Sequence, residues 1–153
     1  MEEYTEDINI NTEEHTKKYT YIEKERKLII LSWNMCSYRK YKVYLQKMIA
    51  ELEPDVVCIQ EPNHSKKLNI KITGYTVHAT TEYSQHHNII TYFKKGIKIT
   101  PVTENGTFIH PMNAFRINLP HVPTQYTITN LYARHDRDLD GPAIEHILAT
   151  NPR

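Results

Sequence analysis

Asn34 and Glu61 are the two residues of this sequence whose types and positions could do chemistry together. Each lies just after a short apolar run, Leu28–Trp33 and Val56–Ile59. A carboxylate at the tip of a buried strand is costly unless it is paired or binds a cation. Hard divalent cations such as Mg²⁺ take oxygen ligands, often one or two carboxylates together with water and substrate phosphate. The pair therefore predicts the start of a cation or phosphate site.

Simpler roles stay open for both residues. Glu61 could be a structural carboxylate bonded to the backbone or to an arginine, and Asn34 could cap the end of a strand. Elsewhere, the nine histidines form no HExxH pattern, and the chain has neither a glycine-rich phosphate loop nor a serine nucleophile motif. The sequence therefore supports neither a kinase nor a serine hydrolase.

A strand–helix–strand unit would bring Asn34 and Glu61 together, although they are far apart in the chain. Between the two apolar runs the spacing is helical, with Ser37 as a capping residue and Pro54 ending the helix after Leu52. If the strands are parallel neighbours, their carboxyl ends lie at the same edge of the sheet. Ligands of open α/β sheets bind at that edge, so we expect the two side chains to meet there.

After Pro62 the pattern changes to short β segments followed by a helix that begins at Pro142. Lys94–Gly96 predicts a hairpin between its two neighbouring strands. The order of elements predicts an α/β (α+β) domain with mixed sheets. The expected strands are Ile70–Thr73, Tyr75–Ala79, Asn88–Phe93, Ile97–Val102, Ala114–Leu119 and Tyr126–Tyr132.

The composition limits the partners and the compartment. The net charge is only +1, but Met1–Glu14 has no Lys or Arg, so the rest of the chain is cationic. That charge fits a phosphate-rich partner, although a solvated surface explains it equally well. The start lacks the apolar region of a secretory signal, no stretch could span a bilayer, and Cys36 and Cys58 match no zinc pattern. We expect a reduced, nuclear or cytoplasmic protein with no membrane partner.

The chain divides into two parts by composition. Residues 1–26 have many charges and few large aliphatic side chains, which predicts a disordered leader. Residues 27–153 are long enough for one domain with a single core. A last helix with no strand after it indicates a truncated domain.

Three segments carry a family resemblance: SWN at 32–34, PDVVCIQEPN at 54–63 and TNLYARH at 129–135. The first two resemble the endonuclease/exonuclease/phosphatase family, and the last looks most like the endonuclease domains of non-LTR retrotransposons. The resemblance covers roughly residues 28–135. It implies a partial four-layer α/β sandwich with mixed β-sheets, in which an N-terminal βαβ unit is followed by antiparallel strands.

The resemblance also implies roles for three residues. Asn34 and Glu61 would line a site for Mg²⁺ or Mn²⁺, and Tyr132 would help to hold a phosphate, with DNA as the partner. This chain departs from the family where Cys36 replaces a frequent Asp or Asn and Arg134 replaces a proline. It also contains neither the GD-x-N nor the S-D-H motif, which supply the general base and the catalytic histidine.

These departures imply a fragment of a metal-dependent phosphodiesterase, weak or inactive as an enzyme by itself. Two other interpretations stay open. One is a non-catalytic module derived from the same fold, which binds nucleic acid or a protein. The other is a poorly folded remnant of such a domain.

Overall fold

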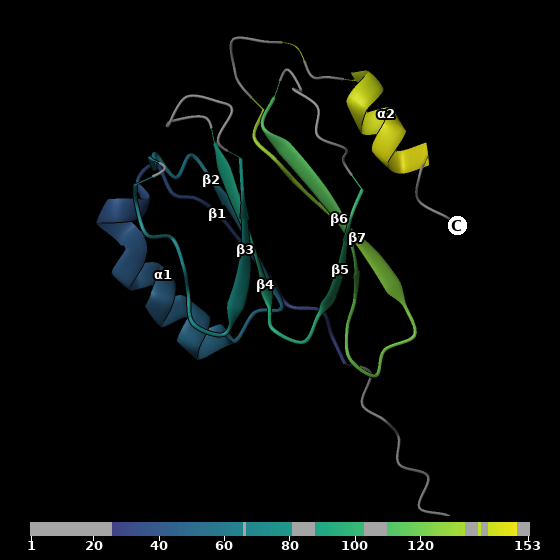
Figure 1. The fold of residues 1–153 in the computed structure, drawn as a ribbon, viewed down its shortest axis with the longest axis horizontal. Helices are drawn as coiled ribbons and strands as arrows, with labels where there is room; N and C mark the ends of the chain where they lie inside the picture. The colour runs from purple at the N-terminus through teal and green to yellow at the C-terminus, as the bar shows by residue number, and fades with distance from the viewer. Residues whose placement is uncertain are drawn as a thin grey trace, which may run out of the picture.

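A computed structural model describes residues 26–65, 67–80, 88–102, 110–133, 138 and 141–149. The predicted leader lies outside these residues, apart from Arg26. The described strands form two sheets, with strand orders β1-β2-β4-β3 and β5-β6-β7 (Figure 1). The elements are β1 (Ile30–Asn34), α1 (Tyr38–Leu52), β2 (Val56–Gln60), β3 (Tyr75–Ala79), β4 (Ile89–Lys94), β5 (Lys98–Pro101), β6 (Met112–Asn118), β7 (Gln125–Leu131) and α2 (Gly141–Ala149).

The predicted βαβ unit is confirmed: β1 and β2 pair in parallel, in a register that runs from Ile30 opposite Val56 to Asn34 opposite Gln60. The expected capping residue, Ser37, accepts a hydrogen bond from the backbone N–H of Lys40 at 3.4 Å. This bond satisfies a donor that the first turn of α1 would otherwise leave without a partner. The helix therefore begins only four residues after β1 ends.

The core lies on both faces of the first sheet, because successive side chains of a strand point to opposite faces. Val57 and Ile59 of β2 pack with buried residues of α1, including Leu45. Val56 and Cys58 face the second sheet. Burial on both faces explains why the sequence of β2 is a continuous apolar run rather than an alternating one.

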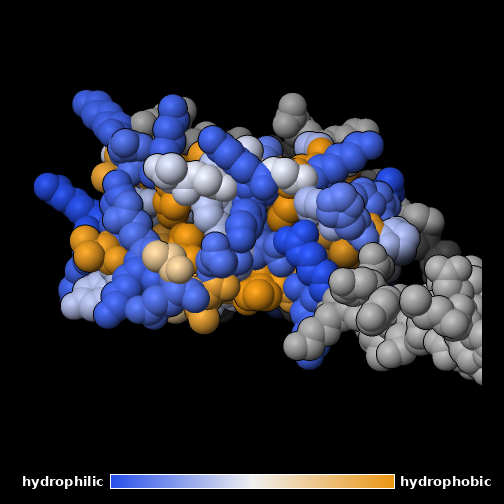
Figure 2. Space-filling model, turned by 90° about the horizontal axis from the view of Figure 1, so that it is seen from below, coloured by the Kyte–Doolittle hydropathy of each residue, from blue (hydrophilic) through white to orange (hydrophobic). Residues whose placement is uncertain are grey.

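The amino ends of β1 and β2 are held by an ion pair. Asp55 is only 3% exposed, and its carboxylate accepts from Arg26 Nη2 at 2.7 Å and from the backbone N–H of Ile29 at 3.0 Å. These bonds fix the register at the end of the strands opposite Asn34. Figure 2 views the molecule from that end, where apolar surface shows between hydrophilic side chains. No described helix is long and apolar enough to cross a membrane.

The prediction of a strand at Ile70–Thr73 is wrong. Ile70 and Ile72 lie in irregular chain that leads into a turn at Gly74, where φ is +85°. The carbonyl oxygen of Ile70 accepts from the hydroxyl groups of Tyr38 at 3.3 Å and Tyr92 at 2.8 Å. Two buried tyrosines therefore satisfy this backbone group, so it needs no neighbouring strand.

The predicted hairpin around Lys94–Gly96 is also wrong, although the turn itself is present and Gly96 adopts a φ of +95°. Within the described sheets, β4 pairs with β2 on one side and with β3 on the other. Because both edges of β4 are occupied, the chain after the turn crosses to the second sheet and pairs with β6 as β5. The expected pairing of the strands now seen as β6 and β7 is confirmed.

Candidate metal and phosphate site

Asn34 and Glu61 are in direct contact at the carboxyl end of β1 and β2. The parallel register places Asn34 opposite Gln60, and Glu61 follows as the next residue. Asn34 Nδ2 donates to Glu61 Oε1 at 2.9 Å. Asn34 is exposed and Glu61 is half-buried, so water or a ligand can reach the pair. The structure thus brings together the two residues that the sequence singles out for metal binding.

Cys36 is the third group at this position. Its Sγ lies 3.5 Å from Asn34 Oδ1 and 4.0 Å from Glu61 Oε2, within reach of weak thiol hydrogen bonds to both oxygens. The amide and carboxylate oxygens suit a hard cation, whereas a thiol is a soft ligand. Among the described residues, no group of three or more His, Cys, Asp or Glu side chains could hold a metal ion. Water and substrate oxygens would therefore have to complete the coordination.

The loops that carry these side chains adopt an unusual backbone conformation. Cys36, Glu61 and Asn63 all have positive φ, at 58°, 49° and 45°. Such a conformation costs on the order of 1 kcal/mol for each residue that is not glycine. Two backbone bonds hold the loops together, from Met35 N to Gln60 O at 2.9 Å and from Tyr38 N to Pro62 O at 2.6 Å. Strained residues held in this way are typical of functional sites.

Tyr132, the third predicted site residue, directly follows β7. Its backbone N–H donates to Pro111 O at 3.0 Å, which extends the β6–β7 ladder, and its side chain is half-buried. Asn130 of β7 accepts from Gln60 Nε2 of β2 at 2.8 Å. This bond places Tyr132 at the same end of the two sheets as Glu61. Arg134, which replaces a proline of the family pattern, and His135 lie outside the described residues.

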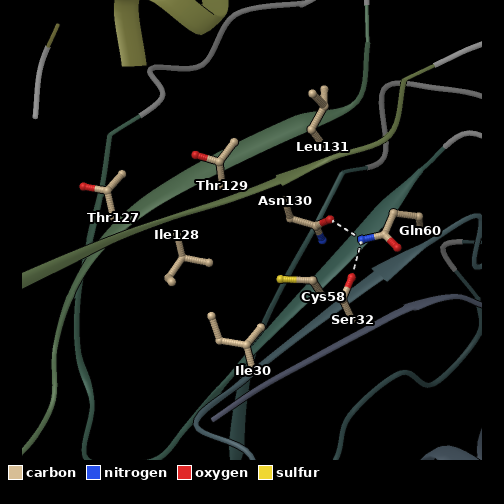
Figure 3. A pocket seen from close by; sticks show the side chains of 9 residues that line it. All are labelled: Ile30, Ser32, Cys58, Gln60, Thr127, Ile128, Thr129, Asn130 and Leu131. Carbon is tan, nitrogen blue, oxygen red and sulfur yellow. Dashed lines mark hydrogen bonds between the residues drawn. The ribbon is translucent and has the colours of Figure 1, made fainter. Parts of the chain in front are cut away.

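A buried polar network links the two sheets below this site, and the sequence analysis missed it. Asn130 is 1% exposed, and its Nδ2 donates to Thr91 Oγ1 at 2.9 Å and to the carbonyl oxygen of Ile90 at 3.1 Å. Thr91 donates in turn to Asn113 Oδ1 at 2.9 Å. Gln60 also lies 3.5 Å from Ser32 Oγ (Figure 3).

The signal for this network is present in the sequence. Gln60 and Thr91 lie in strands that are otherwise largely apolar, whereas Asn113 and Asn130 lie in β6 and β7, which mix apolar and polar residues. Buried polar groups are hydrogen-bonded in native structures, so polar residues in core strands predict contacts with one another. The sequence alone does not reveal which strands face each other, and thus which pairs form.

His64 is a further residue that the sequence analysis missed, three positions after Glu61. It is 4% exposed, and its Nδ1 has no hydrogen-bond partner within the part of the chain that the structure describes. Burial lowers the pKa of His64, because removal from water disfavours the charged imidazolium. The His64 ring is therefore neutral at neutral pH.

Comparison with known proteins agrees with the fold. The model of the Endonuclease/Exonuclease/phosphatase family matches residues 31–149. A solved structure, the "Endonuclease domain of TRAS1, a telomere-specific non-LTR retrotransposon", superposes with a TM-score of 0.55 and 17% sequence identity, over 80% of this chain and 52% of that chain. This chain thus spans about half the length of that structure. No curated protein sequence matches this chain. Because the family model covers most of the chain, the protein belongs to the endonuclease/exonuclease/phosphatase family.

Proposed function

We propose that the protein carries the metal-binding part of a phosphodiesterase site of the retrotransposon endonuclease type, with DNA as the substrate. The observation that carries this proposal is the 2.9 Å hydrogen bond between Asn34 Nδ2 and Glu61 Oε1 at the carboxyl end of two parallel strands. The available oxygens fit Mg²⁺ or Mn²⁺, which often bind through one or two carboxylates and the oxygens of a phosphate. Glu61 and Asn34 would hold the ion.

Each residue has a separate task in this proposal. A bound divalent ion supplies positive charge that stabilises the phosphoryl oxygens during hydrolysis. Asn34 orients the carboxylate of Glu61 by donating to its Oε1. Tyr132, at the same end of the sheets, would donate its hydroxyl hydrogen to a phosphate oxygen. Donors positioned before the reaction stabilise developing charge without reorganisation.

Basic side chains next to the site support a phosphate-rich partner. Arg39 and Lys40 are exposed in the first turn of α1, which begins four residues after Asn34. Lys40 also lies 5.0 Å from the centre of the Tyr41 ring. Cationic groups near the N-terminus of a helix favour binding of phosphate.

We expect the chain by itself to be weak or inactive as an enzyme. Its 153 residues contain no GD-x-N and no S-D-H segment, so the general base and the histidine implied by the family resemblance have no counterpart in its sequence. Loss of such groups lowers rates by orders of magnitude. In this proposal the chain is therefore a fragment of a metal-dependent DNA endonuclease, with weak or no turnover alone.

Nicking of supercoiled plasmid in Mg²⁺ or Mn²⁺ tests this proposal. We expect slow nicking that needs the divalent ion, disappears in Glu61→Ala and persists in Glu51→Ala, an exposed carboxylate on α1. Fast turnover would contradict the expected weak activity. Nicking that survives Glu61→Ala would contradict the assigned site.

A non-catalytic nucleic-acid-binding module is the second candidate, and the thiol of Cys36 beside Glu61 favours it. A soft ligand in this position weakens a site for a hard cation. Salt-dependent DNA binding that is unchanged in Glu61→Ala, with no nicking in either ion, would support the module over the enzyme.

A further inference from the structure

Cys36 is a part of the Asn34–Glu61 site that the proposed function does not use. Its thiol is exposed, and its Sγ lies 3.5 Å from Asn34 Oδ1 and 4.0 Å from Glu61 Oε2. The 2.9 Å bond between the other two side chains joins Asn34 Nδ2 to Glu61 Oε1, so it involves neither of these oxygens. Sγ, Oδ1 and Oε2 therefore form a cluster of three donor atoms at the ends of β1 and β2.

Backbone hydrogen bonds on both sides of Cys36 hold its sulfur in this cluster. Met35 N donates to Gln60 O of β2 at 2.9 Å, and Ser37 N donates to Met35 O at 2.7 Å. The helix α1 begins directly after Ser37. The sulfur thus lies beside the two oxygens without any bound ion, and a ligand set that is already in place binds at a lower cost in conformational entropy.

The spacing of the donor atoms fits a tetrahedral ion that accepts sulfur. Bonds of about 2.3 Å to sulfur and about 2.1 Å to oxygen, at a tetrahedral angle, separate the two ligand atoms by about 3.6 Å. The observed separations from Cys36 Sγ, 3.5 Å and 4.0 Å, lie on either side of this value. Three protein ligands and a water molecule are also the composition of zinc sites that keep an open position.

Mg²⁺ suits the same cluster less well. It requires a nearly octahedral set of oxygen ligands at about 2.1 Å and keeps several water molecules. The sulfur beside Glu61 Oε2 occupies space where Mg²⁺ would hold a water molecule or a phosphate oxygen. Zn²⁺ is a softer ion that binds thiolate and carboxylate ligands alike.

We propose that Cys36 sets the metal preference of this site, which binds Zn²⁺ through Cys36 Sγ and Glu61 Oε2 in preference to Mg²⁺. Asn34 Oδ1 is a weaker third ligand, and water completes the coordination. When the ion binds, it takes the place of the thiol proton, which passes to water. This preference depends on the metal site proposed above, because it concerns the same Asn34 and Glu61.

The cysteine content of the chain makes the sulfur ligand easy to identify, because there are only two cysteines. Cys58 is 6% exposed and packs in the core between the sheets. Burial raises the pKa of the Cys58 thiol to about 11, so this thiol stays protonated at neutral pH. A signal from a metal–thiolate bond in the folded protein therefore identifies Cys36.

Cobalt substitution tests the sulfur ligand with the full chain, in anaerobic buffer without an added thiol. Co²⁺ takes the ligands of Zn²⁺ and absorbs in the near ultraviolet when it is bound to a thiolate. We expect this band in wild type and in Cys58→Ala, and its loss in Cys36→Ser, a change at an exposed side chain. An equimolar amount of Zn²⁺ should displace the cobalt, since Zn²⁺ binds such ligands more tightly.

Competition with Mn²⁺, followed by electron paramagnetic resonance, measures the preference. We expect Cys36→Ser to raise the Zn²⁺ concentration that displaces Mn²⁺ by at least about tenfold, while the affinity for Mn²⁺ changes less than about threefold, because mainly the softer ion gains from sulfur. A cobalt band that persists in Cys36→Ser, or equal displacement by Zn²⁺ in both proteins, would overturn the zinc preference. The proposed metal site would still stand if Mn²⁺ binding depended on Glu61. Absence of any Mn²⁺ or Zn²⁺ binding would overturn the metal site, and the zinc preference with it.

Discussion

The identity of one residue, Cys36, has the largest influence on the chemistry of the site. Asn34 and Glu61 provide oxygens for a hard cation, and the thiol of Cys36 lies 4.0 Å from Glu61 Oε2. The positive φ of Cys36 is a conformation that Asp and Asn adopt more readily than most residues. The backbone conformation thus already suits an acidic side chain there.

Cys36→Asp is expected to strengthen the binding of Mg²⁺ by about tenfold or more, because a second carboxylate replaces a soft thiol. Cys36→Ala serves as the control, since it removes the thiol without adding an oxygen. Isothermal titration with Mg²⁺ measures both. If the aspartate variant bound Mg²⁺ no more tightly than the alanine variant, Cys36 would not be part of the site.

His64 makes stability depend on pH. Burial lowers its pKa below the ordinary 6.5, so below that pH the unfolded chain takes up a proton that the folded protein does not bind. The free energy of unfolding therefore falls as the pH drops from about 7 towards the lowered pKa. We expect urea unfolding to show a weaker pH dependence in His64→Gln than in wild type. An unchanged slope, or an equal change in the exposed control His121→Gln, would contradict this.

Some of the helices, strands and strand pairings could be predicted from the sequence, and others could not. The β1–α1–β2 unit follows from local patterns, namely two apolar runs, helical spacing and a serine cap, so the meeting of Asn34 with Glu61 was predictable. The pairing of β5 was not, because it depends on β3 occupying the edge of β4. The irregular segment at Ile70 was not predictable either, because the partners of its carbonyl group are tyrosine hydroxyls from distant elements.

Asn130 of β7 is hydrogen-bonded to both β2 and β4, so its replacement should lower the free energy of unfolding. Asn130→Ala would remove the hydrogen bonds that a buried side chain makes with Gln60, Thr91 and the carbonyl oxygen of Ile90, so we expect a loss of about 2–3 kcal/mol in the free energy of unfolding. Asn118→Ala removes a more exposed bond to Gln125 and should cost less than about 1 kcal/mol. Urea denaturation measures both. Equal losses would show that the network does not hold the sheets together.

At the scale of the whole molecule, the two sheets and α1 place the basic start of α1 next to the Asn34–Glu61 pair. Family and fold were predictable from the motifs around Asn34 and Glu61, because these motifs lie at the ends of the paired strands. The hydrogen bonds of Asn130 across the two sheets were not predictable, because they require the relative position of the sheets.

DNA binding is expected to weaken as salt increases, because cations released from phosphates drive the association. Arg39→Gln combined with Lys40→Gln should reduce the slope of log K against log salt by about 1 to 2. Lys47→Gln, further along α1 and paired with Glu51, is the control and should leave the slope nearly unchanged. Fluorescence anisotropy across a salt series measures the slopes, and an equal reduction in the control would contradict an interface at the start of α1.

Binding of Mn²⁺, followed by electron paramagnetic resonance, tests the central claim most directly, because it requires no turnover. We predict that the full chain binds Mn²⁺ and that Glu61→Gln weakens this binding by about tenfold or more, since Mg²⁺-type cations depend on carboxylate ligands. The matched variant Glu51→Gln, on α1, should bind as wild type does. Equal affinity of wild type and Glu61→Gln would contradict the metal site.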